Sequence, residues 1–153
     1  MRAMQDTVST EYRNASLIRR LAALVYDLFL IVAIWMLSTT LLVAFVADGD
    51  EVRGWPFQLL LYFELFAFYY VFWRIRGQTL GMQVWKIKAV NERGEIMDGE
   101  QCVLRFLAAT LSVAPFGLGL LWILTNRENL ALHDLATNTR VIYLGDKPYE
   151  SER

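Results

Sequence analysis

Three long apolar blocks dominate the pattern of hydrophobic and polar positions along the chain. They cover residues 28–47, 55–73 and 103–125, and each is close in length to the ~20 apolar residues that cross a bilayer as a helix. The chain is 56% hydrophobic, and its mean hydropathy is +0.31. A soluble domain of 153 residues does not need three such blocks, so the pattern predicts an integral membrane protein.

The third block is interrupted near its middle by Pro115, Gly117 and Gly119, which weaken a continuous helix. The pieces on either side are each too short to cross ~30 Å at a rise of ~1.5 Å per residue. Arg127 and Arg140 follow the block, and such basic residues favour the cytoplasmic side. We expect a broken or re-entrant element that enters and leaves on that side. A single proline-kinked span is the open alternative.

Two short segments have the alternating pattern of β-strands. In the first, at 84–90, apolar residues alternate with Lys86 and Lys88, and a turn sequence follows at 91–94. The second segment covers residues 139–144. Because a lone strand is only marginally stable, we expect the two segments to pair with each other.

Together these patterns predict an all-α membrane bundle. It has two full transmembrane helices, a broken or re-entrant third hydrophobic element and a small cytoplasmic β element. We divide the chain into an N-terminal cytoplasmic tail at 1–16, a membrane domain at 17–144 and a C-terminal tail at 145–153. The first apolar block is longer than the core of a cleavable signal peptide, so we expect it to remain as an anchor.

The basic residues predict the orientation in the membrane. Arg13, Arg19 and Arg20 precede the first apolar block, which places the N-terminus in the cytoplasm under the positive-inside rule. The connection at 48–54 is acidic and suits the outer side, whereas the polar stretch after the second block is basic again. We therefore expect a multi-pass protein of the cell membrane, and in a bacterium of the inner membrane.

Two charged residues lie near the start of the first apolar block. Arg20 and Asp27 are seven positions apart, so on a helix they share a face and are separated by about 10.5 Å along the axis. That is too far for direct contact between neighbours on one helix. Arg20 could snorkel to lipid phosphates while Asp27 caps or pairs with another helix, or the two could line a polar path.

Glu64 lies nine residues from both Trp55 and Trp73, which flank the second block where interfacial aromatic residues are common. This spacing places its carboxyl group about 13.5 Å from either interface, at the midplane. Glu64 could join neighbouring helices by a hydrogen bond as a neutral acid, or it could carry a proton or a cation.

Near the C-terminus, His133 and Asp134 are adjacent, but one such pair is a weak metal signal and the chain has no second histidine. We expect instead a short capped helix from Asn129, with its leucines docked on the bundle. Asp134 would then lie on the same membrane face as Arg20. We expect Arg20 to pair with Asp134 or Asp27, because a half-desolvated arginine requires a carboxylate.

Composition gives no sign of a cofactor or a catalytic centre. Cys102 is the one cysteine, so it can form neither an internal disulfide nor a cysteine-based metal site. No metal or other cofactor is expected. The net charge of −1 supplies no overall basic field, so nucleic acid is not an expected partner. No nucleophile, base and orienting group occur at a recognisable spacing, and we do not expect an enzyme.

Three segments, taken in order, resemble the RDD family of small membrane proteins, which is named for one arginine and two aspartates. Arg20 and Asp27 lie in RRLAALVYDLFL, and Asp134 lies in ALHDLATNTRVIY. The stretch GQTLGMQVWKIKAV at 77–90 is similar to the family's loop after the second helix. The resemblance covers about residues 16–144 and implies a membrane role of poorly defined activity, with transport of ions or small molecules proposed for some members.

The chain departs from the family pattern at three positions. Met82 stands where a basic residue is usual, and Ala131 stands where one is frequent. Either change removes a charge on which a site could depend. Asn138 replaces a frequent glycine, which is a mild change because asparagine also tolerates the left-handed conformation.

Two functions follow as hypotheses. The first is cation- or proton-coupled transport by a homo-oligomer, with Asp27, Glu64 and Asp134 as the carboxylates and Arg20 as the charge that tunes Asp27. An oligomer is required because so few spans cannot readily enclose a path. The second is an accessory or assembly subunit, whose partners are membrane lipids and another membrane protein.

Overall fold

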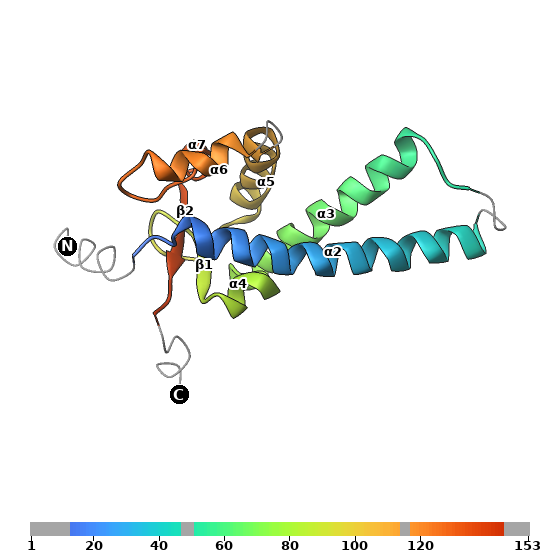
Figure 1. The fold of residues 1–153 in the computed structure, drawn as a ribbon, viewed down its shortest axis with the longest axis horizontal. Helices are drawn as coiled ribbons and strands as arrows, with labels where there is room; N and C mark the ends of the chain where they lie inside the picture. Colours follow the sequence, from blue (N-terminus) through green and yellow to red (C-terminus); the bar gives the residue numbers. More distant parts are fainter. Residues whose placement is uncertain (1–12, 47–50, 114–116, 146–153) are drawn as a thin grey trace.

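Two long helices extend together from a smaller folded head (Figure 1). The computed structural model describes residues 13–46, 51–113 and 117–145. The long helices are α2 (Leu17–Phe45) and α3 (Trp55–Arg76), and the head comprises the described residues 13–16 and 77–145. Because α2 contains neither proline nor glycine, its 29 residues form one rod about 43 Å long.

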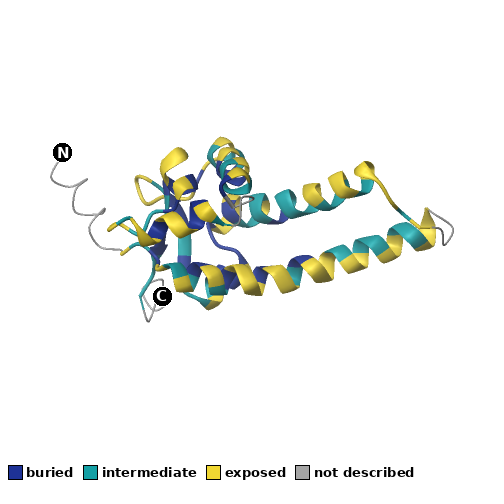
Figure 2. Cartoon of the chain, turned by 45° about the horizontal axis from the view of Figure 1, so that its top comes forward, coloured by how far each residue is buried: buried dark blue, intermediate teal, exposed yellow. Residues whose placement is uncertain are grey.

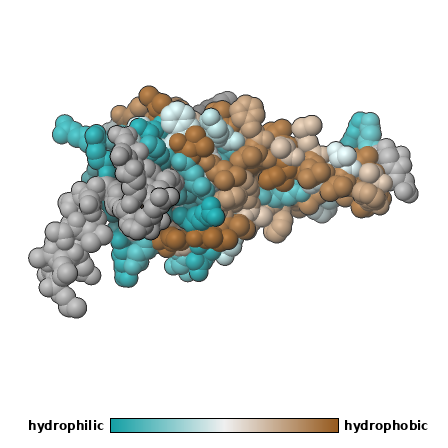
Figure 3. Space-filling view, turned by 90° about the horizontal axis from the view of Figure 1, so that it is seen from below, coloured by the Kyte–Doolittle hydropathy of each residue, from teal (hydrophilic) through white to brown (hydrophobic). Residues whose placement is uncertain are grey.

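The long helices expose apolar side chains, whereas the buried residues gather in the head (Figure 2). Phe29 on α2 is 73% exposed and Phe63 on α3 is 63% exposed. Seen from below, hydrophobic surface covers the long helices and polar surface gathers at the head (Figure 3). Both helices are long and apolar enough to cross a bilayer. The two long apolar helices that the sequence predicts are therefore present.

The first of these helices begins earlier than the apolar block at 28–47 indicates. Because α2 starts at Leu17, both Arg20 and Asp27 lie on the helix itself, and both side chains are buried against the head. At the same end of the pair, α3 ends at Arg76, and its C-cap Gly77 adopts a left-handed conformation with φ of 68°. This conformation turns the chain back toward α2.

The third apolar block forms several pieces. They are α5 (Gly99–Val113), α6 (Leu118–Leu121) and the short 3₁₀ helix η1 (Trp122–Leu124). A capping box of Asp98 and Gln101 starts α5, since the backbone N–H of each residue donates to the side chain of the other. A Cβ on Gly119 would lie 2.3 Å from the Cβ of Ser112, so α6 packs directly on α5. Pro115 lies outside the described residues.

The two predicted strands pair as expected. Strand β1 (Ile87–Asn91) is antiparallel to β2 (Thr139–Tyr143), and Ala89 lies opposite Val141. The other edge of β2 is covered by the residues before α2. The N–H of Ala15 donates to the carbonyl of Val141 at 2.8 Å, and the N–H of Tyr143 donates to the carbonyl of Arg13 at 2.8 Å. Residues 13–15, assigned to the tail from the sequence, thus belong to the head.

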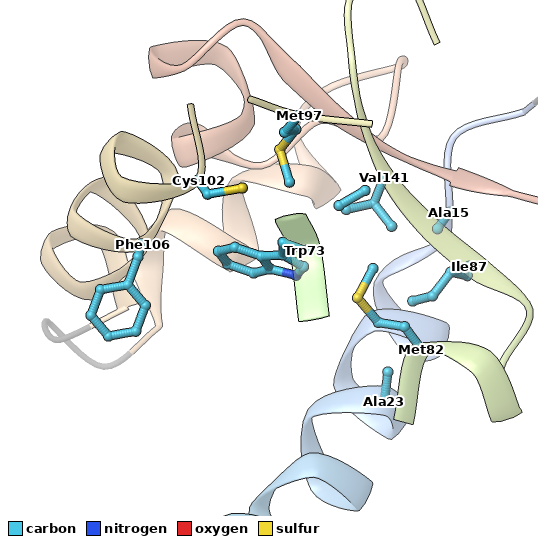
Figure 4. Close-up of a cluster of buried hydrophobic side chains, with 10 residues drawn as sticks. Ala15, Ala23, Trp73, Met82, Ile87, Met97, Cys102, Phe106 and Val141 are labelled. Carbon is cyan, nitrogen blue, oxygen red and sulfur yellow. The ribbon is translucent and has the colours of Figure 1, made fainter. Parts of the chain in front are cut away.

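Trp73 lies in the middle of the head's hydrophobic core (Figure 4). Cys102 and Phe106 from α5 lie on one side of its ring, and Met82 from α4 (Leu80–Val84) lies on the other. The core therefore joins the end of α3 to α4 and α5. It fixes the head to the base of the long helices.

The last helix, α7 (Leu132–Ala136), differs from the expectation. It begins at Leu132 rather than at Asn129, and the side chains of Leu132 and Leu135 are nearly half exposed. Its buried residues are His133 and Asp134 instead. Hydropathy alone predicts that the leucine face of α7 is buried, because it cannot account for the arginines that neutralise the buried aspartate.

Candidate functional site

Asp134 lies between two arginines at the base of the long helices. Its Oδ2 is 2.5 Å from Nη1 of Arg20, and its Oδ1 is 2.7 Å from Nη2 of Arg105. The N–H of Ala131, just before α7, donates to Oδ2 at 3.0 Å. Asp134 is 1% exposed and both arginines are 5% exposed or less, so the three charges form a buried network. Of the two expected partners of Arg20, Asp134 is therefore the one that it contacts, and Asp27 binds elsewhere.

Each arginine of this network also binds other segments. The Nε of Arg20 donates to the carbonyl of Ala15 at 3.2 Å, and its Nη2 donates to the carbonyl of Asn129 at 2.9 Å. The guanidinium group thereby joins α2 to the segment before it and to the loop before α7. Arg105 donates to the hydroxyl of Thr139 at the start of β2. The network ties α2, α5, α7 and β2 together.

The network sets the protonation of its acidic and imidazole groups. Burial alone would raise the pKa of Asp134, but the guanidinium groups of Arg105 and Arg20 outweigh burial and lower this pKa to about 2. Burial, together with the positive charge of Arg105, lowers the pKa of His133 to about 4. Asp134 is therefore a carboxylate at neutral pH, and His133 is uncharged.

Ser112, His133 and Asp134 together have the residue types of a hydrolase triad. The Oγ of Ser112 is 3.1 Å from Nδ1 of His133, and Nε2 of His133 is 3.8 Å from Oδ1 of Asp134. The electrostatics oppose catalysis, because a histidine with a pKa near 4 is a poor base beside two arginines. Asp134 is engaged by those arginines, so it cannot orient the ring as a triad aspartate does.

The lowered pKa of His133 predicts that the protein loses stability in mild acid. An unfolded histidine takes up a proton near pH 6.5, whereas the folded one resists until about pH 4, so the unfolded state binds more protons between these values. We expect the free energy of unfolding to fall by about 2 kcal/mol between pH 7.5 and 5. Unfolding titrations at both pH values measure this loss. The loss should disappear in His133→Gln. If that variant loses the same stability in acid, a group other than His133 causes the loss.

Asp27 forms a second buried contact, separate from the first. Its Oδ2 accepts a hydrogen bond from the hydroxyl of Thr79 at 2.6 Å, and its Oδ1 accepts one from the N–H of Gly81 at 2.9 Å. Thr79 is also the N-cap of α4, since its hydroxyl accepts from the N–H of Met82. The carboxyl group of Asp27 thus holds the N-terminal turn of α4 against α2. This is the capping role that the sequence left open for it.

The loop sequence after α3 is explained by the same contact. A Cβ on Gly81 would lie 2.2 Å from the carbonyl oxygen of Ala23, so only glycine allows α4 to lie this close to α2. Gly77 supplies the left-handed turn that ends α3. Met82 is buried in the core, where the resemblance leads one to expect a charge. Gly77, Thr79 and Gly81 are therefore structural positions of the loop.

Glu64 lies away from both contacts, between the two long helices. Its Oε2 accepts a hydrogen bond from the hydroxyl of Ser38 at 3.0 Å. One turn earlier on α2, the indole N–H of Trp35 donates to the carbonyl of Leu61 at 3.1 Å. Ser38 is eleven residues beyond Asp27, or about 16.5 Å along the helix. The four candidate residues thus occupy three places and do not form one continuous polar path among the described contacts.

The sequence did not single out Arg105, Thr79 or Thr139 as site residues. Arg105 is the one charged residue in the apolar run at 103–113, and a lone charge in such a run is a signal for a buried partner. The roles of Thr79 and Thr139 depend on tertiary contacts and have no comparable signal.

Within the described residues, no group of three or more His, Cys, Asp or Glu side chains is arranged to hold a metal ion. The buried Cys102 does not offer a reactive thiol, because burial raises its pKa to about 11. The described polar side chains of the site thus form ion pairs and hydrogen bonds between segments of the chain.

Two apolar helices with a polar head define a membrane-type protein. The RDD family model matches residues 14–138, and the chain belongs to the RDD family. An uncharacterized protein of Bacillus subtilis (strain 168), YxaI, is 38% identical over 65 residues, which are 42% of each chain. The chain thus spans less than half the length of this relative. No solved structure matches.

Proposed function

We propose that this protein is an accessory or assembly subunit of the membrane, in which the arginine and the two aspartates of the family hold the head against the spans. The observation that supports this proposal is that all three side chains are buried and bonded to other parts of the chain. Arg20, Asp27 and Asp134 are each 5% exposed or less and are bonded to other segments of the chain. Such groups maintain a shape and are poorly placed to take up and release an ion.

The head is proposed to lie in the cytoplasm. Of the 15 basic residues of the chain, only Arg53 lies in the connection between α2 and α3. The described part of that connection, residues 51–54, is at the end of the long helices far from the head. The remaining basic residues precede α2, lie in its first turn or follow the middle of α3, which is the distribution that the positive-inside rule associates with the cytoplasm.

Helix α5 is proposed to dip into the bilayer from the head and return through α6. The hydroxyl of Thr110 on α5 is 3.1 Å from that of Tyr62, which lies eleven residues from Trp73. Along α3 this corresponds to about 16.5 Å, or roughly half the ~30 Å core. Leu111 and Leu118 near the turn are 76% and 61% exposed, as side chains facing lipid would be.

Single cysteines at exposed positions test this topology. In intact cells, an impermeant maleimide should label Glu51→Cys from outside, but should label Glu95→Cys and Arg127→Cys only after permeabilisation. The native Cys102 provides the unlabelled background, because it is buried and protonated. External labelling of Arg127→Cys would show that the third block crosses the membrane, and the re-entrant proposal would then be wrong.

The accessory role itself requires a partner in the membrane. The exposed apolar face of α2, which includes Phe29 and Leu37, is the proposed contact. After extraction in digitonin at native expression, we expect a stoichiometric membrane protein to remain bound. Phe29→Ala with Leu37→Ala should release it, whereas Leu111→Ala on α5 should not. Recovery of only this chain, alone or as a homo-oligomer, would contradict the accessory role.

Transport by a homo-oligomer is the second candidate, and Glu64 is the observation that favours it. A partly buried carboxyl group between two spans is a feature of proton pathways. Purified protein in liposomes under an imposed pH gradient would then carry protons, and Glu64→Gln would abolish the flux while Glu51→Gln would not. Absence of flux in the unmodified protein would exclude this role.

A further inference from the structure

A polar cavity of about 290 Å³ opens on the surface of the head. It is enclosed by segments that are distant in the sequence, namely the residues before α2, the turn after β1, the loop before α7 with α7 itself, and the start of β2. Side chains fix this wall, since the side-chain amide of Asn14 donates to the carbonyl of Glu128 at 2.7 Å, and Arg20 donates to the carbonyl of Asn129. The volume is close to the lower end of the range for preformed ligand sites, ~300–1,000 Å³, and suits a small metabolite.

The charges of this cavity differ with depth. Asp134 is 1% exposed and lies at the floor, and its two arginine partners leave one positive charge uncompensated there. Arg140 also lines the cavity and is partly buried. The carboxylates of Glu92 and Glu128 are exposed and therefore lie at the rim. The cavity is thus positive in its depth and negative at its opening.

Several polar groups of the lining are left without a partner in the part of the chain that the structure describes. Arg140, Glu92 and Glu128 form no ion pair there, either with each other or with other side chains. The Nε of Arg140 and the Oδ1 of Asn14 are buried and have no hydrogen-bond partner among the described residues. Buried polar groups are normally paired, so the wall of the cavity carries a donor and an acceptor that a ligand would satisfy.

We propose that this cavity binds an amino acid with a basic side chain, such as lysine, with its carboxylate at Arg140 and its side-chain ammonium group at the two glutamates of the rim. A carboxylate matches the planar donors of a guanidinium group. Leu130 and Leu135 also line the cavity and offer apolar surface to the methylene groups between the two charged ends.

The same charges disfavour simpler ligands. A small anion would be repelled by both glutamates at the rim, and a metal cation would be repelled by Arg140 and by the positive floor. A ligand with separate negative and positive ends meets neither repulsion. The inference goes beyond the accessory role and does not depend on it, because every residue that lines the cavity belongs to the head.

Isothermal titration calorimetry of the full chain in detergent tests the proposal with L-lysine and three analogues. 1,5-Diaminopentane lacks the carboxylate, L-norleucine lacks the side-chain ammonium group, and L-glutamate carries the opposite charge on its side chain. L-Lysine should bind with a stoichiometry of one, and each analogue should bind at least about tenfold more weakly, the effect of losing one charged hydrogen bond. If L-lysine does not bind saturably, or if any analogue binds as tightly, the proposal is wrong.

Matched variants test whether lysine binds in this cavity. Arg140→Gln should weaken binding of L-lysine about tenfold, whereas Arg127→Gln, which changes an exposed arginine outside the lining, should leave it unchanged. Glu92→Gln should weaken binding about threefold, as expected for an exposed ion pair, whereas Glu95→Gln in the same turn should not. Circular dichroism of each variant verifies its fold. Equal affinities within either pair of variants would overturn the inference.

Discussion

Replacing Asp134 with alanine should destabilise the protein by about 3–5 kcal/mol, the cost of removing one partner from a buried ion pair. The carboxylate is 1% exposed and is the described acid that contacts both Arg20 and Arg105. Without it, two buried guanidinium groups face each other with no counter-charge. Titration with sodium dodecyl sulfate in mixed micelles, followed by circular dichroism, measures the free energy of unfolding.

Two further variants make this result specific. Asp134→Asn keeps the shape of the side chain and removes only the charge, so it should also lose most of the stability. Glu92→Ala removes an exposed acid from the same head and should change the free energy of unfolding by less than about 0.5 kcal/mol. If Asp134→Ala were no more destabilising than Glu92→Ala, the buried network would not stabilise the fold.

The second large effect is expected at Gly81. An alanine there would place its Cβ 2.2 Å from the carbonyl oxygen of Ala23 and 2.9 Å from Oδ1 of Asp27. Backbone cannot move aside as a side chain can, so α4 must separate from α2 and both hydrogen bonds of Asp27 are strained. We expect a loss of about 3 kcal/mol, at the upper end of the range for overpacking. The same unfolding titration measures it.

Gly99→Ala is the matched control for this substitution. Its Cβ would meet only the hydroxyl end of Tyr70, at 2.9 Å, and that side chain can rotate away. It should therefore cost much less than Gly81→Ala. Equal losses in the two variants would mean that the close approach of α4 to α2 is not tightly constrained.

The sequence was sufficient to predict the parts of the fold that depend on local pattern. The apolar runs predict the two long helices, because a span requires only length and hydropathy. The alternation at 84–90 and at 139–144 predicts the two strands, and the instability of a lone strand predicts their pairing. The capping box at Asp98 and Gln101 is equally local.

The sequence predicted the candidate site only in part. Pairing of Arg20 with Asp134 follows from a general rule, since a desolvated charge requires a partner and few were on the same side. Arg105 was missed although it is a lone charge in an apolar run, because the local sequence does not show which acid it contacts. That Asp27 caps another helix was one of the open alternatives, but its partners Thr79 and Gly81 were not predicted. They depend on how closely α4 approaches α2, and no spacing in the sequence encodes that distance.

The buried face of α7 was also not predictable from the local sequence. Leucine spacing predicted that Leu132 and Leu135 would dock on the bundle, yet both remain nearly half exposed. The helix instead turns His133 and Asp134 inward, because two arginines from distant segments neutralise the aspartate. A hydropathy pattern cannot show that a buried charge is neutralised by residues far away in the chain.

Arg20 and Asp134 together hold the C-terminal part of the head to α2. A double-mutant cycle of Arg20→Ala and Asp134→Ala in unfolding titrations measures this coupling. If the pair is coupled, the double variant should lose less stability than the sum of the single variants, by about 2 kcal/mol, because either substitution alone already ends the interaction. Strictly additive losses would contradict the claim.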